Sequence, residues 1–250
     1  MRRFANTFIT AMLAGFIGGI LLTGIQSLRV LPLIHEAENY EGQAIINYAT
    51  GQAVEMETTV AIGSHMESGH EDLGSKDVWS PASGAQRLVL TGVANVCISV
   101  AFSFILLALF NLIEGLSILR GIAFGFMGYV IFFLVPSIGL APELPGATAA
   151  GVFYRQIWWL MTVLCTGAAF ALIYFRNNPI ERVYSLVLVA LPHIFGAPQP
   201  AIHGGSAPKQ LAADFVIATH ITNSVFWLIL GGLTAALLLY LERRQQALSE

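Results

Sequence analysis

The sequence predicts an all-α membrane protein: a polytopic bundle of five to six transmembrane helices with one acidic extracytoplasmic loop segment. The mean hydropathy of the chain is +0.70 and only 11% of its residues are charged, whereas soluble domains average about 25% charged residues. Several apolar runs are long enough to span a bilayer. All six histidines lie on the same side of these runs. We therefore expect one integral membrane domain over residues 1–250.

Five long apolar runs are interpreted as spanning helices, because in lipid only a helix satisfies its own backbone hydrogen bonds. They cover residues 4–28, 88–113, 121–140, 157–175 and 215–241. The first run resembles a signal peptide, but it is too long and no small-residue cleavage site follows it. We expect it to be retained as a helix whose small residues allow a neighbour to approach closely. These residues are Gly15, Gly18 and Gly19.

A sixth run, residues 183–196, is short for a span and contains Pro192 and His193. It is either a kinked or tilted sixth helix or a re-entrant segment, and the second reading leaves five spans. Lys and Arg favour cytoplasmic loops. With six spans and the N-terminus in the cytoplasm, the inner segments hold seven of the twelve basic residues, which are Arg2, Arg3, Arg120, Arg176, Arg182, Arg243 and Arg244. This bias favours both termini in the cytoplasm, and we expect the protein to lie in a bacterial inner membrane.

The segment of residues 30–87 is predicted to be extracytoplasmic, and it holds nine of the fifteen acidic residues. His35, Glu38 and Glu41 follow an i, i+3, i+6 spacing, which places them near one stripe of a helix. An imidazole and two carboxylates could hold a divalent transition metal there. The alternative is a solvated acidic helix on the membrane surface.

A second group of ligand-type side chains follows in the same segment. His65 and His70 lie within eight residues of a thioether and three carboxylates, a combination suited to borderline cations. Neighbouring glycines predict mobility, and ordering a mobile loop would weaken binding. A solvated polar loop is the alternative, although either arrangement would raise the local cation concentration.

Polar residues at membrane depth are expensive and often functional. His193 lies near the outer end of the fifth helix in a six-span arrangement, His220 lies about two turns into the last helix, and His203 lies in the loop between them. These three histidines can converge at one outer vestibule. Taken singly, each is equally well explained by an interhelical hydrogen bond.

Several classes of function are disfavoured. The net charge of −3 is not basic enough to indicate nucleic-acid binding. Cys97 and Cys165 lie inside apolar runs, which argues against disulfides or a cysteine-rich zinc site. The phosphate-binding Gly-x-x-x-x-Gly-Lys-[Ser/Thr] pattern does not occur, and no nucleophile–base pattern or metalloprotease motif supports an enzyme. We expect no tightly bound cofactor, and membrane lipid is expected as a partner.

Short motifs along nearly the whole chain resemble the CbtA family of proposed bacterial cobalt transporter subunits. The motifs are Pro32-Leu33-Ile34, Ala37-Glu38-x-Tyr40-Glu41, Glu143-Leu144-Pro145-Gly146, Gln156-x-Trp158-Trp159 and Leu191-Pro192-His193-x-x-Gly196-Ala197-Pro198. The resemblance implies cobalt uptake linked to cobalamin supply, five spans, and a small single-span CbtB partner with a histidine-rich tail. It supplies no ligand set.

Three functions are therefore considered. The first is a permease subunit for divalent metal, which transports cobalt(II) or nickel(II) captured by outer carboxylates and imidazoles. The second is a non-transporting accessory subunit of a larger membrane complex. The third is a redox or haem-binding membrane enzyme with His193 and His220 as axial ligands, and an absorption spectrum would reveal a haem.

Overall fold

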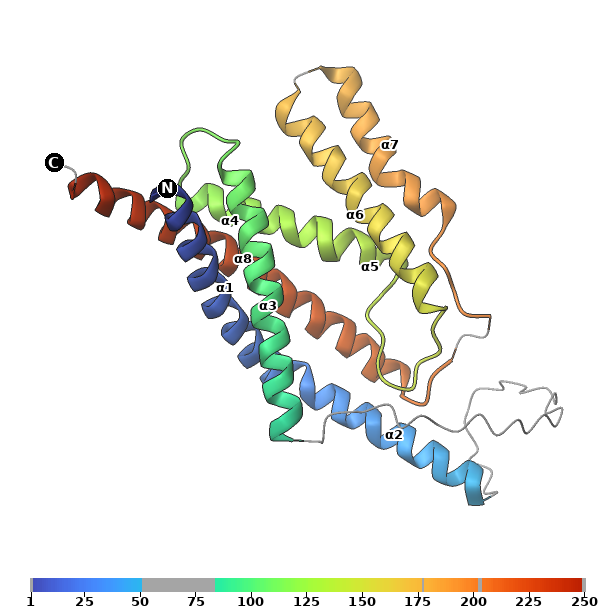
Figure 1. Ribbon diagram of the computed structural model, residues 1–250. Coiled ribbons are helices and arrows are strands. Elements are labelled where there is room, and N and C mark those ends of the chain that lie inside the picture. Colours follow the sequence, from blue (N-terminus) through green and yellow to red (C-terminus); the bar gives the residue numbers. More distant parts are fainter. Residues whose placement is uncertain (1, 51–83, 177, 202–203, 249–250) are drawn as a thin grey trace.

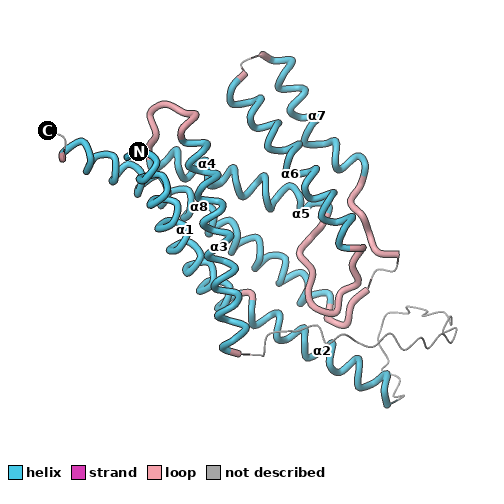
Figure 2. Tube along the Cα trace, in the orientation of Figure 1, coloured by secondary structure: helices cyan, strands magenta, loops and turns pink. Residues whose placement is uncertain are grey.

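The computed structural model describes residues 2–50, 84–176, 178–201 and 204–248, which fold into helices joined by loops (Figures 1 and 2). These residues contain no β-strand, only an isolated bridge between Ala147 and Gly205. The all-α prediction is confirmed. The elements are α1 (Arg2–Arg29), α2 (Leu31–Thr50), α3 (Ala85–Phe110), α4 (Ile118–Tyr129), the π-helix η1 (Val130–Leu134), α5 (Val135–Gly139), α6 (Val152–Phe175), α7 (Pro179–Phe195) and α8 (Lys209–Ala247).

Five helical units in the described residues are long and apolar enough to cross a membrane: α1, α3, the continuous α4–η1–α5 unit, α6 and α8. The protein is therefore a multi-pass membrane protein. The short sixth run forms α7, whose 17 residues span about 25 Å against a hydrocarbon core of about 30 Å. Figure 1 shows α7 running back alongside α6, against which it chiefly packs.

The two chain ends lie at the same end of the bundle (Figure 1). There the Gln245 amide near the end of α8 donates a hydrogen bond of 2.8 Å to the Asn6 amide oxygen in α1. A chain that returns to its starting end has crossed the bundle an even number of times. In Figure 1, α7 runs from the end of α6 back toward the end of the bundle where α8 begins, and this return brings α8 back to the end where the chain starts.

The opposite end is built by α2, the loop of residues 140–151 and the described parts of the loop before α8, which are residues 196–201 and 204–208. A buried apolar cluster joins these parts and consists of Val30, Ala37, Leu144, Leu211 and Phe215. The loops also bond to each other, since Thr148 and Gly204 exchange hydrogen bonds of 2.9–3.0 Å. In the orientation predicted from the basic residues, this is the extracytoplasmic end.

Glycines set the closest helix contacts, as the sequence predicted for α1. A Cβ at Gly15 or Gly19 would overlap the backbone of α3 at Val100 or Val96. At Gly18 it would lie 2.8 Å from the Leu230 side chain of α8. Such close backbone approach increases dispersion contacts, which drive helix association in lipid in place of the hydrophobic effect. Glycines perform the same role between α4 and α8, at Gly121, Gly125 and Gly231.

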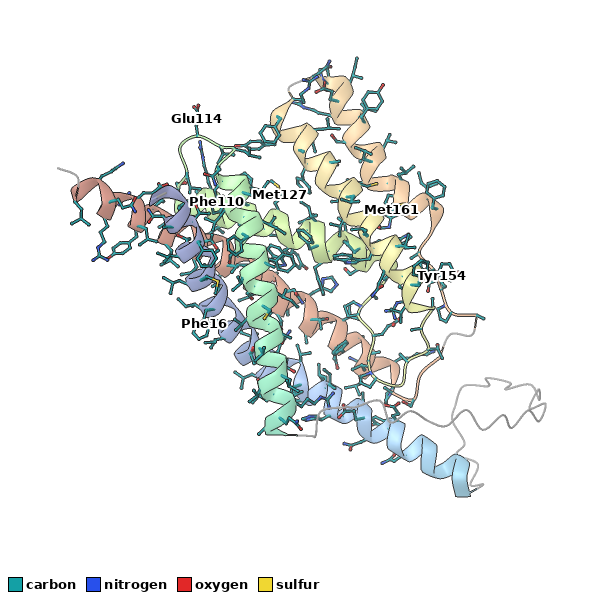
Figure 3. All side chains as sticks on the ribbon, in the orientation of Figure 1. Phe16, Phe110, Glu114, Met127, Tyr154 and Met161 are labelled. Carbon is teal, nitrogen blue, oxygen red and sulfur yellow. The ribbon has the colours of Figure 1, made fainter. Side chains whose placement is uncertain are left out.

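The main core fills the space between α1, α3, α4 and α8, and it includes the buried residues Leu107, Phe110, Trp227 and Leu230. By contrast, Phe16 is 54% exposed and lies on the outer side of α1 in Figure 3. An exposed apolar side chain is expected where a helix faces lipid. The bundle therefore has a closely packed interior and an apolar outer surface that suits contact with lipid.

The third span is not a regular helix. Its last turns pass through η1 into α5, and Pro136 cannot donate a backbone hydrogen bond to the carbonyl of Phe132. The indole nitrogen of Trp159 in α6 donates to that carbonyl instead, at 3.3 Å. The irregular segment therefore attaches the α6–α7 pair to the rest of the bundle.

Candidate functional site

His220 of α8 forms the centre of a polar cluster at membrane depth. Its ring nitrogens lie 2.9 Å from the Tyr129 hydroxyl at the end of α4 and 3.3 Å from the Ser137 hydroxyl in α5. The ring also packs edge-on against Phe133 of η1, with centroids 5.0 Å apart. The imidazole thus links the last span to the irregular part of the third.

The hydrogen bonds of this cluster define the state of the imidazole. The Ser137 hydroxyl donates to the Leu134 carbonyl at 2.8 Å, so it can only accept from His220. In the neutral ring, this arrangement favours the tautomer in which Nε2 carries the hydrogen and Nδ1 accepts from Tyr129. A metal ion could bind either nitrogen only by displacing one of these hydroxyl partners.

A cavity of about 360 Å³ adjoins this cluster, between η1–α5 and the first turns of α6. Its lining is mostly apolar with a few polar groups, as is usual for small-ligand sites. Ser137 belongs both to this lining and to the His220 cluster. The remaining lining residues are Phe132, Phe133, Pro136, Leu140, Ala141, Pro142, Val152, Arg155, Gln156 and Trp159.

One ion pair lies at the edge of this cavity. The guanidinium of Arg155 lies 2.9 Å from the carboxylate of Glu143, and the two side chains are 29% and 33% exposed. Arg155 lines the cavity and Glu143 does not. The pair joins the 140–151 loop to α6 close to the start of that helix. Figure 3 labels Tyr154, which precedes Arg155 in the chain.

His193 lies in a different setting, between α6 and α7. Its ring packs edge-on against Trp158, with centroids 5.5 Å apart. The Trp158 indole donates a hydrogen bond of 3.1 Å to the carbonyl of Pro192. His193 Nε2 is buried and has no hydrogen-bond partner within the described residues, so this nitrogen is available to a ligand that can reach it.

The structure places the two intramembrane histidines on opposite sides of α5. Ser137 contacts His220, whereas a Cβ at Gly139 would overlap Trp158, which covers His193. Residues two apart in a helix differ by about 200° around the axis. Among the described residues, no hydrogen bond or ring contact joins His193 to His220.

The three predicted ligands on α2, which are His35, Glu38 and Glu41, do not share one partner. Glu38 forms an ion pair with Arg87 at 2.7 Å, and Glu41 lies near Gly146 of the facing loop. His35 is exposed. Within the described ranges, no group of three or more His, Cys, Asp or Glu side chains is placed to hold a metal ion. The assignment of His35, Glu38 and Glu41 as ligands stays a prediction.

Three further candidates, His65, His70 and His203, lie outside the described residues. Their assignment as metal ligands, and that of His193 and His220, likewise stays a prediction.

Sequence reasoning missed Tyr129 and Ser137 as partners of His220. They are 91 and 83 residues away in the chain, so no local spacing indicates the contact. The only local signal is Pro136, which predicts a freed carbonyl in an apolar run. The sequence also did not predict the ion pair between Glu143 and Arg155, although Glu143 belongs to the Glu143-Leu144-Pro145-Gly146 motif.

The fold and the cavity define a multi-pass helical membrane protein with a polar cluster at membrane depth and a small cavity beside it. The family model described as "Probable cobalt transporter subunit (CbtA)" matches residues 4–239, nearly the whole chain. The chain belongs to the CbtA family. No curated protein matches the chain, and no solved structure matches it.

Proposed function

We propose that this protein is a permease subunit for uptake of a divalent transition metal, with cobalt(II) as the first candidate and nickel(II) as the second. The observation that supports it most is the cavity of about 360 Å³, because its wall includes Ser137, which bonds to His220. An ion entering this cavity would meet the Ser137 hydroxyl, which separates it from the His220 imidazole. Membership of a family of probable cobalt transporter subunits supports the same function.

Capture would begin at the extracytoplasmic end in this proposal. The carboxylates of Glu38 and Glu41 and the imidazole of His35 would attract the hydrated ion, together with His65 and His70. Cobalt and nickel both accept mixed imidazole and carboxylate ligands, so this chemistry alone does not separate them. The ion would then pass to the imidazoles of the next step, which are His193, His203 and His220.

Release must follow capture, so binding along the path has to be weak. The hydrogen bonds of His220 supply a reason for weak binding. A metal ion at either ring nitrogen would replace a bond to Tyr129 or Ser137, and the lost bond would offset part of the coordination energy. When the ion leaves, the hydroxyl returns to the ring.

The proposal places the protein in a bacterial inner membrane with its N-terminus in the cytoplasm. The basic residues of the segments near the chain ends support this orientation. The family description names a subunit, and the resemblance of the motifs implies a small single-span partner with a histidine-rich tail. Since the chain has no phosphate-binding loop motif, ATP could act only through another chain.

Uptake of radiolabelled cobalt tests the proposal in cells with and without the protein, with the partner co-expressed. We expect uptake to require the protein and to fall at least tenfold in His220→Ala. Asn223→Ala is the matched control, since Asn223 lies one turn further along α8 and bonds only to the Thr219 carbonyl. Equal uptake with and without the protein would refute a transport role.

Metal content and affinity of the purified protein give a second reading. We expect bound cobalt that decreases in His193→Ala and in His220→Ala. If the protein takes up cobalt in cells and both purified variants keep the cobalt affinity of the unmodified protein, the metal site lies away from these two histidines.

The alternative function, a non-transporting accessory subunit, is favoured by one observation. A second cavity, of about 320 Å³, lies between α3, α4 and α6 and is lined by apolar side chains such as Leu109, Met127 and Phe170. It could receive part of another membrane helix. Purification in mild detergent discriminates, because a stoichiometric large partner without bound metal would favour this function.

A further inference from the structure

The cavity beside His220 contains an unexpected charge for a cation pathway. Among the described residues that line it, Arg155 is the one that carries a charge. An unpaired guanidinium on the wall of an apolar cavity would repel a divalent cation, because the apolar walls screen charge poorly. The charge that cancels it, the Glu143 carboxylate, lies 2.9 Å away outside the lining.

The position of Glu143 is fixed by its loop. Its neighbour Leu144 is buried at 5% exposure in the apolar cluster with Val30 and Leu211. Two residues further on, Gly146 has a φ of 76°, a left-handed conformation that favours glycine. The carboxylate is thus held beside Arg155 by packing as well as by charge.

We propose that the Glu143–Arg155 pair sets the net charge at the wall of the cavity and thereby determines how readily a divalent cation enters it. The inference rests on the proposed transport function and names two residues that control it. With the pair intact, the wall is neutral. Loss of the carboxylate leaves a positive wall, and loss of the guanidinium leaves a negative carboxylate beside the cavity.

The two single substitutions therefore have opposite effects on the concentration of cobalt(II) that gives half-maximal uptake. We expect Glu143→Gln to raise this concentration and Arg155→Gln to lower it, each by about threefold to tenfold, since charged clefts change local ion concentrations by about 10-fold or more. Both shifts shrink as ionic strength rises. A pair that only held the loop in place would give impaired uptake in both variants.

The ion pair between Arg176 and Glu181 is a matched control. It has the same chemistry, with contacts of 3.0–3.1 Å, but it lies between α6 and α7 at the other end of these helices and does not line the cavity. Glu181→Gln should leave the half-maximal concentration unchanged. The exchanged pair, Glu143→Arg with Arg155→Glu, keeps the wall neutral and should remain within about twofold of the unmodified protein.

Uptake of cobalt(II) by whole cells, normalised to the amount of protein in the membrane, decides the matter. Opposite shifts in the two single variants support the inference. If either single variant is absent from the membrane, the variant with the exchanged pair is measured at low and high salt instead. A loss of cobalt affinity in that variant overturns the inference. Shifts in the same direction also overturn it while leaving the transport function standing. No protein-dependent uptake by the unmodified chain overturns both.

Discussion

At the scale of single residues, the state of His220 follows from two hydroxyl groups on another span. Ser137 donates its hydrogen to Leu134, which favours the neutral tautomer of His220 in which Nε2 donates to Ser137 and Nδ1 accepts from Tyr129. The histidine was a candidate from the sequence because a polar side chain in a span is costly. Its partners were not, because they come from distant parts of the chain.

Tyr129→Phe keeps the ring and removes only the hydroxyl that occupies Nδ1. If His220 binds the metal through this nitrogen, we expect cobalt affinity to rise by up to about fivefold, since a net hydrogen bond contributes about 1 kcal/mol. Isothermal titration of the purified protein measures it. Tyr154→Phe, at an exposed position of α6, is the control. A loss of affinity in Tyr129→Phe would show that the hydroxyl supports binding.

At the scale of helices, glycine contacts decide which spans pack together. Hydropathy predicted five long spans because lipid permits few alternatives to a helix, and their small size identified Gly15, Gly18 and Gly19 as contact sites. Hydropathy could not tell that α1 packs on α3, since both helices are apolar all round. Hydropathy also did not decide whether α7 spans the membrane, because a run of this length is compatible with a span or with a re-entrant segment.

Gly15→Ala tests the α1–α3 contact. The added Cβ would overlap the backbone of Val100, and overpacking costs about 1–3 kcal/mol. We expect a lower thermal unfolding midpoint in detergent, measured by circular dichroism. Gly24→Ala is the control in the same helix, because nothing lies within 4 Å of a Cβ placed there. Equal midpoints for the two variants would contradict the contact.

At the scale of the whole molecule, both chain ends lie at one end of the bundle and the candidate site lies toward the other. The sequence predicted this separation from the distribution of arginines and histidines. It did not predict the cavity, whose wall combines η1, α5, the 140–151 loop and α6. A site assembled from several elements depends on how they pack, and no local pattern in the chain encodes that.

Labelling of single cysteines tests the orientation in intact cells, after Cys97 and Cys165 are replaced by serine. We expect a membrane-impermeant maleimide to label Ala149→Cys in the 140–151 loop and to leave Glu114→Cys unlabelled until the cells are opened. Glu114 lies on the loop between α3 and α4 (Figure 3), and Figure 1 shows this loop at the end of the bundle where the N-terminus lies. The reverse labelling pattern would show the opposite orientation in the membrane, with the cavity at the cytoplasmic end.

The length of α8 has a consequence for how the protein sits in its bilayer. Its 39 residues extend about 58 Å, close to twice the hydrocarbon thickness of about 30 Å. The stretch between Asp214 and Glu242 also exceeds that thickness, and a helix meets such a mismatch by leaning, by kinking or by thickening the bilayer around it. A thinner or thicker bilayer changes that mismatch. Lipid composition therefore acts directly on the helix that carries His220.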